Sequence, residues 1–171
     1  PYDWLSNGHQ YALHGFIDDC TGNITGLFMQ RHECFFGYAE VLRHTLVHYG
    51  IPMKLYPDKA GIFFVNNKKN KTVKEQLECK PAKTNFGKII DTLGIDMFPA
   101  HSPQAKGRVE RLWQTLQGRL PTEFRVHNIK TIDEANEYIE KKFIPWYNRR
   151  FGSKPAKGNN FVKMTNLNIL E

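Results

Sequence analysis

Residues 10–30 read QYALHGFIDDCTGNITGLFMQ, and this stretch decides the fold class. Two runs rich in apolar and aromatic residues, 10–17 and 24–30, flank the polar run DDCTGN. Runs of this length separated by turn-forming residues predict a β-hairpin. Asp18 and Asp19 are predicted to form its turn, because aspartate side chains accept hydrogen bonds from nearby backbone amides.

The residues on both sides extend the hairpin into an α/β pattern. Residues 2–5 precede the turn Ser6-Asn7-Gly8 and predict the end of an earlier strand, completing a three-stranded antiparallel meander. After the hairpin, apolar residues spaced three and four apart predict an amphipathic helix over 35–49, with Gly50 and Pro52 as stop signals. Alternation over 51–56 predicts a short strand that ends at Asp58.

The second half continues with helices and one more strand. We expect a helix over 84–93, a strand over 95–98, and a long helix that starts at Ser102-Pro103 and ends at Pro121. Thr131-Ile132-Asp133-Glu134 is a capping box that opens the last helix. Residues 66–83 are predicted to be a mobile insertion. The fold class is therefore α/β, with a mixed sheet of about five strands and helices on both faces.

Composition and charge indicate a soluble domain with a polyanionic partner. The chain has 171 residues, and 24 Lys and Arg against 17 Asp and Glu give a net charge of +7. Nucleic acid is the first expected partner and an anionic membrane surface the second. No apolar run is long enough for a membrane span, and no leader precedes the domain. The start at Pro1 suggests a piece of a longer protein.

Cysteine and histidine give weaker signals. Cys20, Cys34 and Cys79 form no CxxC pair, which favours a reducing, cytoplasmic setting. His44 and His48 are four residues apart on a predicted helix, but a zinc site there lacks a clear set of four ligands. Ordinary core or surface histidines are the favoured interpretation.

Two acids stand out by position. Asp58 follows a central strand, where open α/β sheets place functional groups. Glu110 lies two turns into the predicted long helix among Lys106, Arg108 and Arg111. By spacing alone, a lone glutamate on a basic helix is an ordinary salt-bridge partner.

Four segments together resemble DDE transposases and retroviral-type integrases. HSPQAKGRVER at 101–111 is similar to the segment that holds the last acid of that family, and residues 49–59 to the segment that holds the second acid. Residues 17–22 resemble its second-strand turn, and FIPWYNRRF at 143–151 resembles the end of such cores. The closest resemblance is to ISNCY-type bacterial insertion-sequence transposases. It covers residues 1–152, which leaves 153–171 as a linker or C-terminal extension.

The resemblance implies an RNase H-like fold and DNA transposition by metal-dependent phosphodiester cleavage and strand transfer. Asp58 and Glu110 would bind two Mg²⁺ or Mn²⁺ ions with a third acid. The family's first acid lies on the first strand and would precede Pro1, so Asp3 is the only acid left on that strand and the candidate for this role. Asp18 and Asp19 match turn residues that are not ligands.

The same resemblance implies partners and a location. Lys106, Arg108, Arg111 and, less directly, Lys59 would contact DNA phosphates of transposon ends and target. Relatives act as multimers on DNA, so a homo-oligomer in the bacterial cytoplasm, associated with the nucleoid, is expected.

Two alternatives stay open. One is an RNase H-type nuclease directed to hybrids or junctions, which uses water as its nucleophile. The other is an inactive fragment retained for DNA binding or assembly, whose salt-sensitive DNA affinity would ignore Mg²⁺.

Overall fold

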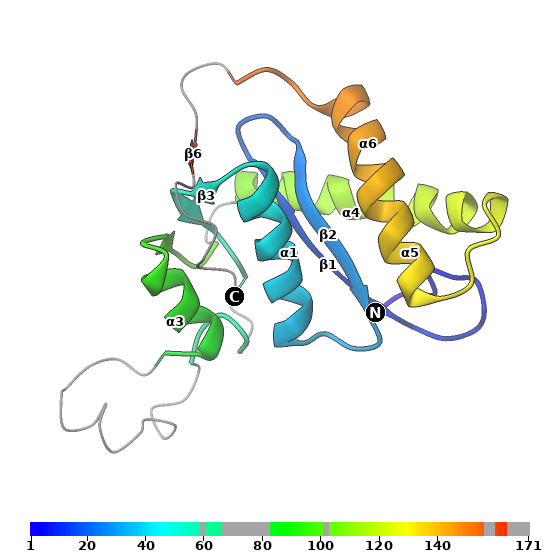
Figure 1. Cartoon of the computed structure of the whole chain (residues 1–171), viewed down its shortest axis with the longest axis horizontal. Coiled ribbons are helices and arrows are strands. Elements are labelled where there is room, and N and C mark those ends of the chain that lie inside the picture. The colour runs from blue at the N-terminus through cyan, green and yellow to red at the C-terminus, as the bar shows by residue number, and fades with distance from the viewer. Residues whose placement is uncertain (59–60, 66–82, 101–102, 156–159, 164–171) are drawn as a thin grey trace.

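The structure is a computed structural model that describes residues 1–58, 61–65, 83–100, 103–155 and 160–163, with only the backbone at 103–106 and 108. The predicted insertion at 66–83 therefore lies almost wholly outside the described residues. The elements in chain order are β1 (Ala12–Ile17), β2 (Ile24–Gln30), α1 (Phe35–His48), β3 (Ile51–Pro52), β4 (Lys54–Leu55), α3 (Asn85–Thr92), β5 (Asp96–Met97), α4 (Pro103–Val126), α5 (Ile132–Tyr138), the π-helix η2 (Ile139–Phe143), α6 (Ile144–Phe151) and β6 (Phe161–Val162) (Figure 1).

The predicted hairpin is confirmed. Strands β1 and β2 pair antiparallel from Ala12↔Gln30 to Ile17↔Ile24, with a shift in register between Phe16 and Ile17 that leaves one extra residue in β2. The earlier strand of the predicted meander is reduced to one bridge, in which Tyr2 and Tyr11 exchange two backbone hydrogen bonds.

The two faces of the hairpin are covered by different helices (Figure 1). Helix α1 approaches one face so closely that a Cβ at Gly26 would lie 2.7 Å from the Val41 carbonyl oxygen. On the other face, Leu27 and Met29 pack in a core with Leu112 and Leu116 of α4. This two-sided burial is what the alternation of side chains along each strand requires.

The outer edge of β2 is covered by the last helical segment. Asn136 of α5 and Asn148 of α6 both bond through their side chains to the backbone of β2. The capping box that starts α5 forms as predicted, since Thr131 Oγ1 accepts from the Glu134 N–H and the Glu134 carboxylate accepts from the Thr131 N–H.

The remaining strands are shorter than predicted. Within the described residues the strands form three two-stranded sheets, β1-β2, β3-β6 and β4-β5, in place of one mixed sheet of about five strands. Strands β3, β4 and β5 have only two residues each, and in the described residues none of them pairs with the hairpin. What is confirmed is an α/β protein with small sheets covered by helices.

The predicted end of the long helix at Pro121 is wrong, because α4 continues to Val126. Leu120 and Phe124 are fully buried one turn apart on either side of the proline, and this packing offsets the loss of one helical hydrogen bond. The tryptophans anchor the core: Trp4 is 3% exposed, and Trp113 and Trp146 pack against the same core.

Candidate catalytic site

Asp58 lies at the carboxyl end of the parallel strand pair. Strand β4 pairs parallel with β5, and the backbone bonds continue past both strands to Ala100 N–H, which donates to the Pro57 carbonyl oxygen at 2.9 Å. Asp58 is thus the first residue after the ladder on one strand, and its side chain is exposed. Ligand sites of open α/β sheets are found at this edge.

Tyr38 of α1 is half-buried beside Glu33, and the charge of Asp58 also acts on it. Burial is the main cause that raises the pKa of the Tyr38 phenol, followed by the charge of Glu33 and its hydrogen bond at 3.0 Å, and then by the charge of Asp58. The Tyr38 ring packs edge-on against His14 and Phe63, at centroid distances of 4.7 and 4.6 Å. The phenol of Tyr38 is therefore neutral, and its hydroxyl donates to the Glu33 carboxylate.

Glu110 lies in the first third of α4, and its side chain is exposed. Helix α4 begins at Pro103, three residues after Ala100, whose N–H makes the bond to Pro57 beyond the β5 ladder. Arg111, the next residue, is exposed, and its Nε donates to the Gly107 carbonyl oxygen at 3.3 Å. The side chains of Lys106 and Arg108, and all of Lys59, lie outside the described residues.

Asp3 is bound by its own loop. Its two carboxylate oxygens accept hydrogen bonds from the backbone N–H groups of Asn7 and Gly8, both at 3.0 Å. These bonds give Asp3 a structural role, which is to close the loop before β1. Among the described residues, Asp3, Asp58 and Glu110 do not form a group of three converging ligands, and their common metal site stays a prediction.

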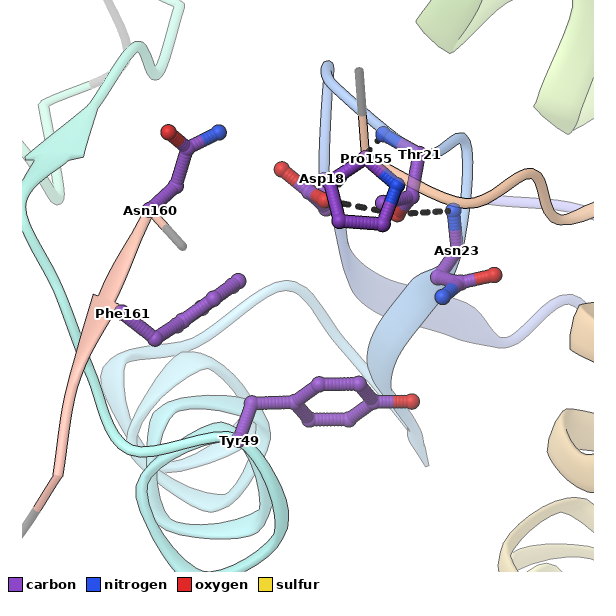
Figure 2. Close-up of a pocket in the computed structure, with 7 residues that line it drawn as sticks. All are labelled: Asp18, Thr21, Asn23, Tyr49, Pro155, Asn160 and Phe161. Carbon is purple, nitrogen blue, oxygen red and sulfur yellow. Dashed lines mark hydrogen bonds between the residues drawn. The ribbon is translucent and has the colours of Figure 1, made fainter. Parts of the chain in front are cut away.

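Asp18 is a turn residue, as predicted. Its carboxylate accepts hydrogen bonds from the Thr21 hydroxyl at 2.6 Å and from the backbone N–H groups of Cys20 and Thr21. Asp18 also lines a pocket of about 100 Å³. Figure 2 shows that this pocket lies between the hairpin turn and the segment around Phe161. The pocket is small and has one charged side chain, so we assign it no reaction.

Sequence reasoning missed Tyr38, which it counted only as one position of the apolar stripe of α1. The signal that was available is a tyrosine five residues after Glu33, within reach of a side-chain hydrogen bond across the helix start. The charge of Asp58 acts on the phenol from a residue twenty positions away in the chain, and no local spacing indicates that.

The chain is similar to bacterial transposases. It is 39% identical over 154 residues to the transposase for insertion sequence IS1202 of Streptococcus pneumoniae, a match that covers 90% of this chain and 32% of that protein. It is 36% identical over 165 residues to the y4bF protein of Sinorhizobium fredii (strain NBRC 101917 / NGR234), whose name also contains the word transposase. That match covers 96% of this chain and 34% of the relative.

The chain thus spans about a third of the length of these curated relatives. No family model matches it, and no solved structure matches it significantly. None of the helices in the described part of the chain has the length and apolar character needed to cross a membrane.

Proposed function

We propose that this chain is the catalytic core of a DDE-type DNA transposase that cleaves and joins DNA strands. The observation that carries the proposal is its similarity to the two relatives over nine-tenths or more of its length. The placement of Asp58 directly after the parallel ladder, and of Glu110 on the helix that follows the partner strand, supports this function.

An RNase H-like fold is part of the proposal. Its support is the order of elements: an antiparallel hairpin, a helix that packs on it, and a parallel strand pair, followed by a long helix. In this fold the short pairs β3-β6 and β4-β5 and the hairpin would belong to one sheet.

Asp58 and Glu110 would hold the metal ions, with Asp3 as the third candidate. Exposed carboxylates are the hard oxygen donors that Mg²⁺ prefers, and no soft donor lies next to either residue in the sequence. Two bound Mg²⁺ or Mn²⁺ ions supply charge stabilisation for the attacking and departing oxygens. Strand β4 would position the carboxylate of Asp58, and helix α4 would position that of Glu110.

The basic residues would position DNA. Arg111 follows Glu110 on an exposed face, and we propose that it contacts a phosphate of a transposon end or of the target, with Lys106, Arg108 and Lys59 in the same role. Assembly as a homo-oligomer on DNA, in the bacterial cytoplasm at the nucleoid, belongs to this proposal as well.

The first test is Mn²⁺ binding by calorimetry to the wild type and to Asp58→Asn, Glu110→Gln and His48→Gln. We expect saturable binding that both carboxylate variants lose and that His48→Gln retains, because imidazole-containing sites bind Mn²⁺ least among the first-row divalent ions. Mn²⁺ binding that ignores both carboxylate changes would overturn the assignment of Asp58 and Glu110.

A second test separates the alternatives by their products. The chain is incubated with Mn²⁺, a supercoiled plasmid and a labelled duplex that carries an end of its own element. Covalent joining of label to plasmid, lost in Glu110→Gln, supports a transposase. Nicking without joining indicates a nuclease that uses water. DNA affinity that ignores both Mn²⁺ and Glu110→Gln, with no products, indicates an inactive binding fragment.

A further inference from the structure

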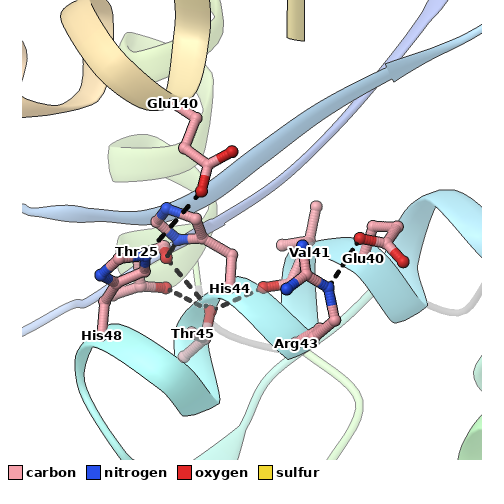
Figure 3. A network of polar contacts seen from close by, with 8 residues as sticks. All are labelled: Thr25, Glu40, Val41, Arg43, His44, Thr45, His48 and Glu140. Carbon is pink, nitrogen blue, oxygen red and sulfur yellow. Dashed lines mark hydrogen bonds and ion pairs between the residues drawn. The ribbon is translucent and has the colours of Figure 1, made fainter. Parts of the chain in front are cut away.

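Three ligand-type side chains converge at the C-terminal half of α1. The side chains of His44 and His48 on α1 and of Glu140 on η2 offer ligand atoms that all lie within 4.8 Å of one another (Figure 3). The two imidazole rings have centroids 4.2 Å apart, and His48 Nε2 lies 4.0 Å from Glu140 Oε1. Glu140 lies almost one hundred residues further along the chain. It is a third candidate ligand that the spacing of His44 and His48 could not indicate.

His44 is already oriented as a metal ligand. Its Nδ1 lies 2.7 Å from the Thr25 carbonyl oxygen, and since a carbonyl only accepts, Nδ1 carries the proton. The neutral ring then leaves the Nε2 lone pair available for a cation. In metal-binding histidines, the ring nitrogen that does not bind the metal usually donates its N–H to a neighbouring acceptor such as a backbone carbonyl. This bond fixes the tautomer and the plane of the ring.

The neighbouring cations are engaged elsewhere. Arg43 Nε is paired with Glu40 at 2.9 Å, as Figure 3 shows, and Lys141 Nζ is paired with Glu137 at 2.7 Å. In the described part of the chain, a divalent cation at the histidine pair therefore meets one carboxylate and two imidazoles, with no lysine or arginine paired to Glu140.

We propose that His44, His48 and Glu140 form a binding site for one Zn²⁺ or a similar borderline divalent cation, separate from the proposed catalytic carboxylates. Two imidazoles and one carboxylate are a common zinc donor set, with water in the fourth position. Bonds of about 2.0–2.2 Å require donor atoms roughly 3.3–3.5 Å apart, so the site closes by movements of about 1 Å. His48 and Glu140 have half-exposed side chains that can make this movement.

Because residue 45 is not the general base that zinc proteases of this spacing use, we assign the proposed ion a structural role. Zinc proteases with two histidines four residues apart place a glutamate directly after the first histidine as general base. Here that position is Thr45, which is buried and bonded to Thr25 of β2 at 3.1 Å. A bound ion would instead join α1 to η2 next to the outer edge of β2, and so hold the helical layer against the hairpin.

The test is binding of Co²⁺ and Zn²⁺ to the whole chain, followed by the visible absorption of Co²⁺ and by competition with a zinc indicator in excess Mg²⁺. We expect one Zn²⁺ per chain, weakened at least about tenfold in both His48→Gln and Glu140→Gln. At a hundredfold excess of free Zn²⁺ over Kd, the Tm of the wild type is expected to rise by about 5–10 °C.

The controls distinguish this site from its rivals. His127→Gln is the matched control, because His127, the first residue after α4, also lies near a carboxylate, 3.8 Å from Glu123. In the described residues, His127 belongs to no group of three ligand-type side chains. Asp58→Asn tests independence from the catalytic proposal. Zn²⁺ affinity unchanged in His48→Gln and Glu140→Gln would overturn the proposal, as would thiolate charge-transfer bands with Co²⁺, which would assign the ion to cysteine.

Discussion

Asn148 is hydrogen-bonded to Ile24 as a neighbouring strand residue would be. The Ile24 N–H donates to Asn148 Oδ1 at 2.7 Å, and Asn148 Nδ2 donates to the Ile24 carbonyl oxygen at 2.8 Å. Asn136 repeats the arrangement at Met29, with distances of 2.7 and 3.1 Å. Two carboxamides thus take the place of a third strand along the outer edge of β2, which would otherwise present unpaired backbone groups.

Replacement of Asn148 by alanine is expected to destabilise the protein by about 1–3 kcal/mol, because it leaves the Ile24 N–H of β2 without its partner. The Ile24 carbonyl oxygen keeps the Tyr49 hydroxyl as a donor at 3.2 Å. Urea unfolding of Asn148→Ala against wild type measures this. The neighbouring exposed Arg149→Ala is the control, with an expected change within about 0.5 kcal/mol. If Asn148→Ala and Arg149→Ala have the same free energy of unfolding, water replaces the Asn148 carboxamide with no loss of stability.

Gly26 and Gly118 should respond to alanine with opposite signs. A Cβ at Gly26 would lie 2.7 Å from the Val41 carbonyl oxygen, and backbone cannot move aside, so Gly26→Ala is expected to cost about 1–3 kcal/mol. Gly118 lies in the exposed part of α4 with nothing near its Cβ, and Gly118→Ala is expected to stabilise by about 0.5–1 kcal/mol. Thermal unfolding of the two variants gives the comparison.

The buried His14 is expected to make stability depend on pH. Its Nε2 accepts from the Cys34 N–H at 3.2 Å, so Nδ1 carries the proton and donates to the Phe28 carbonyl oxygen. Burial, the largest cause, lowers the pKa of His14 below the ordinary value of 6.5. The unfolded chain therefore binds this proton more readily, and stability falls as the pH drops from 6.5 towards the lowered value in the folded state.

The measurement is the free energy of unfolding at about pH 8 and about pH 5, with metal removed, for wild type and His14→Gln. His14→Gln is expected to lose less stability between these two pH values than the wild type. Part of the pH dependence should persist in the variant, because burial also lowers the pKa of His44. Identical pH dependence in both proteins would mean that the pKa of His14 is the same in the folded and unfolded states.

Arg111 is expected to contribute one phosphate contact if the proposed function holds. Arg111→Ala should lower the slope of log affinity against log salt by about 1 on any DNA duplex. Arg125→Ala, near the other end of α4, is the matched control and should leave the slope unchanged. A slope unaffected by Arg111→Ala would place the DNA elsewhere on the chain.

Local patterns predicted the elements that local interactions determine. The hairpin, the start of α5 at Thr131 and the helix over residues 35–48 all follow from turn chemistry, capping and spacing. Pro121 was misjudged because the burial of Leu120 and Phe124 depends on the hairpin against which they pack, and local propensity does not include that partner.

Contacts between distant residues could not be predicted. The bonds of Asn136 and Asn148 to β2 span more than one hundred residues, and each asparagine by itself is an ordinary polar helix residue. The same holds for Glu140 beside His48, and for the charge of Asp58 at Tyr38. The position of Asp58 after a strand indicated a functional group, but its role as a metal ligand, and that of Glu110, came from a resemblance over several segments.

The π-helical segment η2 sets the angle between Asn136 and Asn148 around the axis of the final helix. Asn136 and Asn148 are twelve residues apart, a spacing that would turn them about 120° from each other in a regular α-helix. A π-helix has roughly 4.4 residues per turn, so the five residues of η2 turn the chain about 90° less than five α-helical residues would. Both side chains are thereby directed to β2. Eleven residues of regular helix would reach almost the same orientation. A final helix with one residue fewer and no π turn would therefore still present both asparagines to β2.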